Sequence, residues 1–180
     1  MKTLLKITLT FAALSFFIAC KSTKPYGKEV KDPFSSGKYM TDKKYFRATG
    51  KGQSSKSNVA EKKADMDAKA EMAGQINVTM KEVADAYMGQ TENAESAEVY
   101  EKFQNLSREV VNTNMADLRK VDQKVFSDGE RYTVFAHYEI KKKSMFKYMK
   151  KQAKTQKYVD KKTQKTIEDI IQKEIENSED

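Results

Sequence analysis

Residues 45–87 read YFRATGKGQSSKSNVAEKKADMDAKAEMAGQINVTMKEVADAY, and this stretch decides the fold. Residues 45–50 predict a short strand, and we expect Gly50-Lys51-Gly52 to end it, because glycine is free to turn from a strand into a helix. A long helix follows, with Ser55 or Ser57 as its N-cap. Apolar positions at spacings of three and four then predict one stripe of about eight turns: Ala60, Ala64, Ala68, Met72, Ile76, Met80, Val83 and Tyr87. Because small alanine side chains line its first half, the helix axis can lie close to a sheet.

A second helix and a hairpin follow the break at residues 89–93. The hairpin signal is Asp128-Gly129 between two strand-like runs, residues 118–126 and 131–140, and it predicts a type I′ turn with positive φ at both central residues. The predicted fold class is α+β: a small antiparallel sheet of about three strands with helices packed on one face, plus a long C-terminal helix. The apolar side of the second helix consists of Val99, Tyr100, Phe103, Leu106 and Val110. The face of the last strand that we expect the helices to cover consists of Tyr132, Val134, Ala136, Tyr138 and Ile140.

Charge divides the C-terminal segment, residues 142–180, which the pattern predicts to be a charged amphipathic helix. Residues 141–165 contain eleven lysines and one acid, whereas residues 166–180 contain six acids and one lysine. One interpretation is a solvated helix whose basic half is balanced by its acidic half, within one molecule or between two. The other is a surface for anionic lipid or polymer, formed by Lys141, Lys142, Lys143, Lys147, Lys150, Lys151 and Lys154.

The N-terminus has the pattern of an export signal. Lys2 and Lys6 precede a run of 13 residues, 7–19, that contains no charged side chain. This run is too short to span a bilayer, which needs about 20 apolar residues, but it suits a cleaved signal peptide. Residues 20–43 hold both prolines of the chain and no sustained periodicity, so we expect a flexible tether before a folded domain at residues 44–141.

The formal net charge is +8, and Cys20 is the only cysteine. No disulfide can therefore form within the chain. A basic protein can bind nucleic acid, but an exported one rarely meets any, so anionic lipid head groups or envelope polymers are the expected counterparts.

Two resemblances extend this reading. Phe17-Ile18-Ala19-Cys20 resembles the lipobox of bacterial lipoproteins, with Phe17 in place of the usual leucine. It implies cleavage after a signal peptide of residues 1–19 and acyl chains on Cys20, with no other cofactor. The strand at residues 45–52, the alanine-lined helix and the hairpin together resemble the LPP20-type bacterial lipoproteins over residues 44–141. That family implies an α+β domain held in the cell envelope, and it brings no shared catalytic residues.

Candidate catalytic residues are few. His137 is the only histidine, and one histidine without cysteine or clustered carboxylates builds no zinc site. We expect it to be a surface or hydrogen-bonded structural side chain. Asp67 and Glu71 share a helix face, but alternating charges on a solvated helix explain them better than acid–base chemistry. We therefore expect no catalytic site and no metal site.

The sequence predicts a membrane-anchored envelope lipoprotein that acts as a non-enzymatic structural or interaction module. The alternative is binding of anionic lipid or envelope polymer through residues 141–165. The expected partners are the membrane, through the lipid, and a protein or a second copy, through the C-terminal helix. Resemblance to other lipoproteins places the chain at the outer membrane facing the periplasm, because no acidic cluster follows Cys20.

Overall fold

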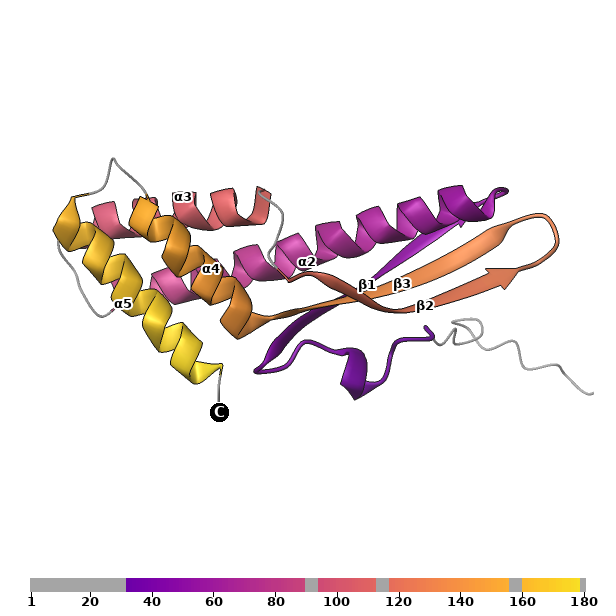
Figure 1. The fold of residues 1–180 in the computed structure, drawn as a ribbon, viewed down its shortest axis with the longest axis horizontal. Coiled ribbons are helices and arrows are strands. Elements are labelled where there is room, and N and C mark those ends of the chain that lie inside the picture. The colour runs from indigo at the N-terminus through magenta and orange to yellow at the C-terminus, as the bar shows by residue number, and fades with distance from the viewer. Residues whose placement is uncertain (1–31, 90–93, 113–116, 156–159, 179–180) are drawn as a thin grey trace, which may run out of the picture. The chain divides into compact units, whose positions relative to one another are not determined.

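The computed structural model describes residues 32–89, 94–112, 117–155 and 160–178. They form a three-stranded antiparallel sheet and four α-helices, which confirms the predicted α+β class (Figure 1). In chain order the elements are η2 (Gly37–Tyr39), β1 (Tyr45–Ser54), α2 (Ser57–Met88), α3 (Ala94–Asn112), β2 (Arg119–Ser127), β3 (Tyr132–Lys141), α4 (Lys142–Thr155) and α5 (Lys161–Asn177).

The sheet has the order β1-β3-β2, so the last strand lies between the other two. β1 pairs with β3 from Tyr45 opposite Lys141 to Ser54 opposite Tyr132. The predicted helix-covered face of β3 is confirmed, because Val134, Ala136, Tyr138 and Ile140 are all buried. The hairpin is confirmed as well, but its turn is not type I′. Within the turn, only Gly129 has positive φ. The Asp128 N–H donates to the Arg131 carbonyl, which places Gly129 and Glu130 at the tip.

Gly50 and Gly52 lie inside β1 and do not end it. Their role is close packing and not a turn, since neither has positive φ. A Cβ at Gly50 would overlap the backbone of Ala64 and Ala68, and one at Gly52 would overlap the backbone of Ala60. The two glycines therefore let the backbone of α2 come into direct contact with β1.

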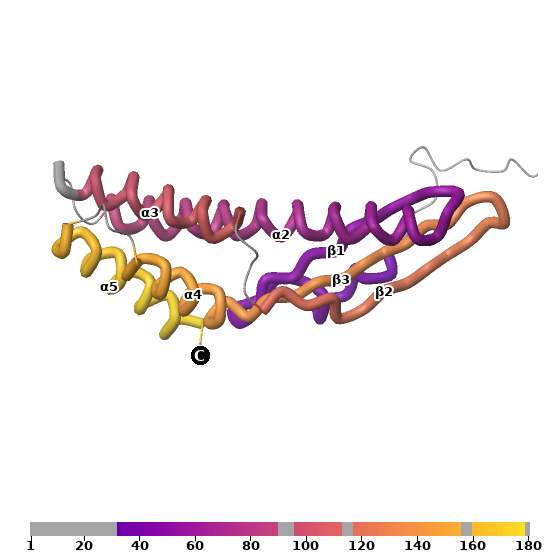
Figure 2. Tube along the Cα trace, turned by 45° about the horizontal axis from the view of Figure 1, so that its top comes forward, coloured from indigo at the N-terminus to yellow at the C-terminus, as the bar shows by residue number. Residues whose placement is uncertain are grey.

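The buried residues of α2 recur at every fourth position: Ala60, Ala64, Ala68, Met72, Ile76, Met80 and Ala84. Each step of four residues turns about 40° beyond a full helical turn, so the buried stripe winds around the helix. Figures 1 and 2 show the matching change of neighbour, with the strands beside the first half of α2 and α3 beside its second half. The predicted serine cap is wrong: Lys56 precedes the helix, and no side chain caps its N-terminus.

The second helix is confirmed as α3, with Val99, Phe103, Leu106 and Val110 buried in the core and Tyr100 partly buried. The charged C-terminal segment is helical as predicted, but in two pieces separated at Asp160. The Asp160 side chain caps α5 by accepting hydrogen bonds from the N–H groups of Lys162 and Thr163. α4 and α5 pack against each other as an antiparallel pair, so Lys150 donates to Gln172, and Gln164 donates to the Ala153 carbonyl.

Residues 32–44, which we call the arm, comprise Lys44 and the described part of the predicted flexible tether, whose residues 20–31 lie outside the described part. The arm is ordered on the face of the sheet opposite α2. Phe34 is buried there, and its ring lies 5.4 Å from that of His137. The Tyr39 hydroxyl donates to Asp122 of β2 at 3.3 Å. Aromatic burial and tertiary hydrogen bonds, which a search for periodicity does not detect, hold the arm in place.

Replacing Gly50 by alanine should lower the free energy of unfolding by about 1–3 kcal/mol, because the added methyl group pushes α2 away from β1. Gly74→Ala in α2 is the matched control: no atom lies within 4 Å of its Cβ position, and alanine favours a helix by about 1 kcal/mol over glycine. Urea unfolding followed by circular dichroism measures both. Equal effects of the two substitutions would contradict the close-contact explanation.

Candidate functional site

Cys20, the predicted lipidation site, and the predicted signal peptide, residues 1–19, lie outside the described residues. The other predicted site residues, the seven lysines, are described, and the structure divides them into two groups. Lys141 is the exposed last residue of β3, where it pairs with Tyr45, and Lys142 begins α4. The remaining five share one face of α4.

We call this group the lysine face: Lys143, Lys147, Lys150, Lys151 and Lys154. At about 100° per residue, these five positions fall within an arc of about 100° on the helix. The opposite side of α4 is buried in the core through Met145, Phe146, Met149 and Ala153. Burial of this apolar side fixes the rotation of the helix, and so the lysines point outward as a group.

Lys142 does not belong to this surface. Its backbone N–H donates to the Lys44 carbonyl at 2.9 Å, and its ammonium lies 4.6 Å from the centre of the Phe46 ring. Burial lowers the pKa of Lys142, although the carboxylates of Asp42, Glu174 and Glu82 oppose this effect. Lys142 therefore joins the arm, the sheet and α4, and the prediction that it delivers surface charge is not supported.

The acidic end of the chain neutralises the lysine face only in part. Lys154 pairs with Glu168 of α5 across 3.7 Å, and Lys150 donates to Gln172, which is neutral. Lys147 and Lys151 are exposed, and within the described part of the chain neither forms an ion pair. α4 carries six lysines and no acid, whereas α5 carries four of each. The helix pair thus keeps an excess of positive charge.

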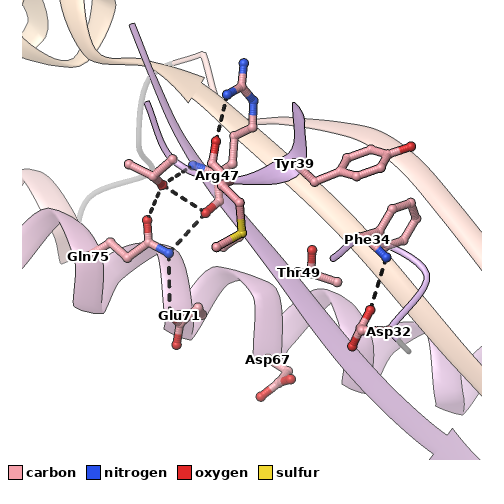
Figure 3. Close-up of a pocket in the computed structure, with 11 residues that line it drawn as sticks. Asp32, Phe34, Tyr39, Arg47, Thr49, Asp67, Glu71 and Gln75 are labelled. Carbon is pink, nitrogen blue, oxygen red and sulfur yellow. Dashed lines mark hydrogen bonds between the residues drawn. The ribbon is translucent and has the colours of Figure 1, made fainter. Parts of the chain in front are cut away.

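A second candidate is an open cavity of about 480 Å³ between the arm, β1 and α2 (Figure 3). Three carboxylates line it, those of Asp32, Asp67 and Glu71, together with the rings of Phe34 and Tyr39. Sequence reasoning placed Asp67 and Glu71 on a solvated helix face. Both are exposed, as expected, and they also lie at the edge of this hollow, because the arm covers this side of β1.

The polar groups of this cavity are engaged in holding the fold together. Asp67 accepts the Lys51 N–H at 2.9 Å. Gln75 donates to the Arg47 carbonyl at 3.0 Å, and the Arg47 N–H donates to the Thr41 hydroxyl at 2.9 Å. These bonds tie α2 and the arm to the edge of β1. The cavity therefore has a structural explanation that needs no ligand.

His137 is buried beneath the arm. Its Nδ1 lies 2.8 Å from the Thr49 hydroxyl, and the rings of Phe34 and Tyr39 cover it, with centroids 5.4 and 4.9 Å away. The interpretation of His137 as a hydrogen-bonded structural histidine agrees with this contact, and the surface alternative is wrong.

Among the described residues, no three histidine, cysteine or acidic side chains are grouped closely enough to hold a metal ion. None of their helices combines the length and the apolar character that a membrane span requires.

Comparison with known proteins found no relative of this chain. No family model matches the sequence, and neither the curated proteins nor the solved structures contain a significant match. The resemblance to the LPP20-type lipoproteins therefore stays a prediction.

The free energy of unfolding should fall as the pH drops from 7.5 to 5.5, because His137 binds a proton less readily in the folded protein than in the unfolded chain. Burial and the Arg47 guanidinium lower its pKa, and Glu139 and Asp122 oppose this only in part. The unfolded chain binds the proton near pH 6.5, so stability is complete above that pH and is lost below it. Urea unfolding at several pH values should give a slope that disappears in His137→Asn. An unchanged slope in that variant would assign the effect to other groups.

Proposed function

We propose that this chain is a lipid-anchored protein of the bacterial envelope, a non-enzymatic interaction module held at the outer membrane and facing the periplasm. The observation that carries the proposal is the export-signal pattern that ends at Cys20. A basic start, a 13-residue uncharged run and a small residue before the cysteine are the features that lipoprotein processing requires. The acyl chains would then act as the anchor, and the folded part would be presented to the envelope.

The length of the intervening chain is compatible with a membrane-proximal role. Eleven residues separate Cys20 from Asp32, where the described arm begins. Fully extended, they reach at most about 40 Å. Any charged surface of the folded part within that reach would be concentrated near lipid head groups.

The lysine face supports a more specific second function, binding of anionic lipid. Each lysine near an anionic membrane contributes about 1 kcal/mol, and the five lysines of this face project from one side of a single rigid helix. The attraction would add to that of the acyl chains, since stable anchoring generally takes more than one signal. Salt should weaken it, because the face is exposed.

The anchor is tested by the intact mass of the membrane-extracted protein, compared with that of Cys20→Ala. The wild type should begin at Cys20 and carry added acyl mass, whereas the variant should lack the acyl mass and appear in the soluble fraction. Retention of residues 1–19 in the wild type, or the absence of acyl mass, would rule out the proposed anchor.

The lipid-binding function is tested with Lys147→Glu/Lys151→Glu in the Cys20→Ala background, using vesicles of phosphatidylcholine with a third phosphatidylglycerol. Loss of two lysines should weaken binding at low salt by at least about 30-fold, from about 1 kcal/mol for each. Lys62→Glu/Lys81→Glu is the control, because it changes the net charge equally at two exposed lysines of α2. If both double variants lose affinity equally, net charge and not the lysine face is responsible.

A further inference from the structure

Two lysine runs that lie far apart in the sequence meet at one end of the sheet. Lys43 and Lys44 directly precede β1, and residues 141–143 join β3 to α4. The Lys142 N–H donates to the Lys44 carbonyl at 2.9 Å, so the two runs lie against each other. Five lysines therefore gather around one backbone junction, although the mutual repulsion of their charges opposes such a cluster.

Two hollows flank this junction, and both reach the end of α5 at Ser178. Figures 1 and 2 show the end of α5 beside the start of α4. One hollow, of about 400 Å³, is lined by Lys43 and Lys142 together with the carboxylate of Glu174, which offsets part of their charge. The other, of about 370 Å³, has no acid in its described lining. We call this second one the basic hollow, and its lining residues are Lys44, Tyr45, Lys141, Lys143 and Ser178.

The described walls of the basic hollow supply positive charge and no counter-charge. Lys44 and Lys141 are exposed, and among the described residues neither forms an ion pair. Lys143 lies in the first turn of α4, which contains no acid. Since the N-terminus of a helix carries a partial positive charge that acids commonly offset, α4 adds to the positive potential of the three lysines.

A phosphate group suits this lining. Lysine ammonium groups bind phosphate as compact point charges. A phosphomonoester carries about 1.5 to 2 negative charges at pH 7, whereas a phosphodiester carries only one, so three lysines favour the monoester. The volume lies within the range of roughly 300–1,000 Å³ that is usual for small-molecule sites. The Tyr45 ring, which packs against the Arg47 guanidinium at 4.8 Å, provides a wall for the organic group that the phosphate carries.

We infer that the basic hollow binds a phosphomonoester group, which Lys44, Lys141 and Lys143 hold by charge. The same group occurs in soluble phosphomonoesters and in lipids that end in a phosphate. This site shares Lys143 with the lysine face and is otherwise separate from it, because Lys44 precedes β1 and Lys141 ends β3. It depends neither on the lipid anchor nor on binding of the lysine face to vesicles.

Titration of the full Cys20→Ala chain with methyl phosphate, at pH 7.5 and constant ionic strength, tests the site. The amide resonances of Lys143 and Ser178 should shift and saturate. Dimethyl phosphate, which has a single charge, should bind at least about tenfold more weakly. Lys44→Gln/Lys141→Gln should raise the dissociation constant for methyl phosphate about tenfold or more, because two of the three ammonium groups are lost.

The matched control is Lys147→Gln/Lys151→Gln, which removes the same charge from two exposed positions of the lysine face. It should change the dissociation constant less than about twofold, since salt screens distant exposed charges. Shifts that do not saturate, or equal losses in the two double variants, would overturn the proposal. Glu179 and Asp180 follow Ser178 in the sequence. Binding seen only in Glu179→Gln/Asp180→Asn would mean that the chain's own carboxylates take the place of the ligand, and would also overturn it.

Vesicles identify the carrier of the phosphate. Phosphatidylcholine vesicles with a third phosphatidic acid present a phosphomonoester, whereas those with a third phosphatidylglycerol present a diester. If the Cys20→Ala chain prefers phosphatidic acid, and Lys44→Gln/Lys141→Gln abolishes that preference, the ligand is a lipid head group. Binding of methyl phosphate without this preference assigns the site to a soluble phosphomonoester. Failure of the lysine face alone would leave methyl phosphate binding intact and make vesicle binding independent of Lys147 and Lys151.

Discussion

The direct contact between the backbones of α2 and β1 is the constraint on which the other features depend. It requires glycine at positions 50 and 52 and alanine at positions 60, 64 and 68, because any larger side chain on either element would separate them. A helix held this close to one edge strand covers β1 and β3. The apolar faces of the remaining helices then gather around the second half of α2, where methionine and isoleucine replace alanine.

Placement of α2 over β1 and β3 gives the sheet two unlike edges. On the β1 side, α2 and the arm supply side chains that bond the backbone of the strand, and the cavity between them is a consequence of that arrangement. β2 receives no such cover. Among the described contacts, Lys120 links β2 to α2 through its ion pairs with Asp65 and Glu61. They lie at the start of the strand, and its apolar middle is exposed.

In the helix pair at the C-terminus, burial of the apolar side of α4 leaves its charged side facing outward. α4 inserts methionine, phenylalanine and alanine into the core, and its lysines are then confined to the opposite side. α5 returns along α4 with equal numbers of acids and lysines. The pairing satisfies the apolar stripes of both helices without neutralising the lysine face, so a charge surface and an apolar core coexist in one small unit.

The sequence by itself determined the long helix, the hairpin, the helix-covered face of β3 and the α+β class, because periodicity and turn residues are local signals. It also predicts an export signal and the lipidation of Cys20. Tertiary structure alone decided the role of Gly50 and Gly52, the burial of His137, and the separation of the exposed Lys141 and the half-buried Lys142 from the five lysines of the lysine face. It decided too that the arm is part of the fold, since Phe34 and Tyr39 pack on a histidine about 100 positions away. Such contacts join residues distant in sequence, and no local pattern records them.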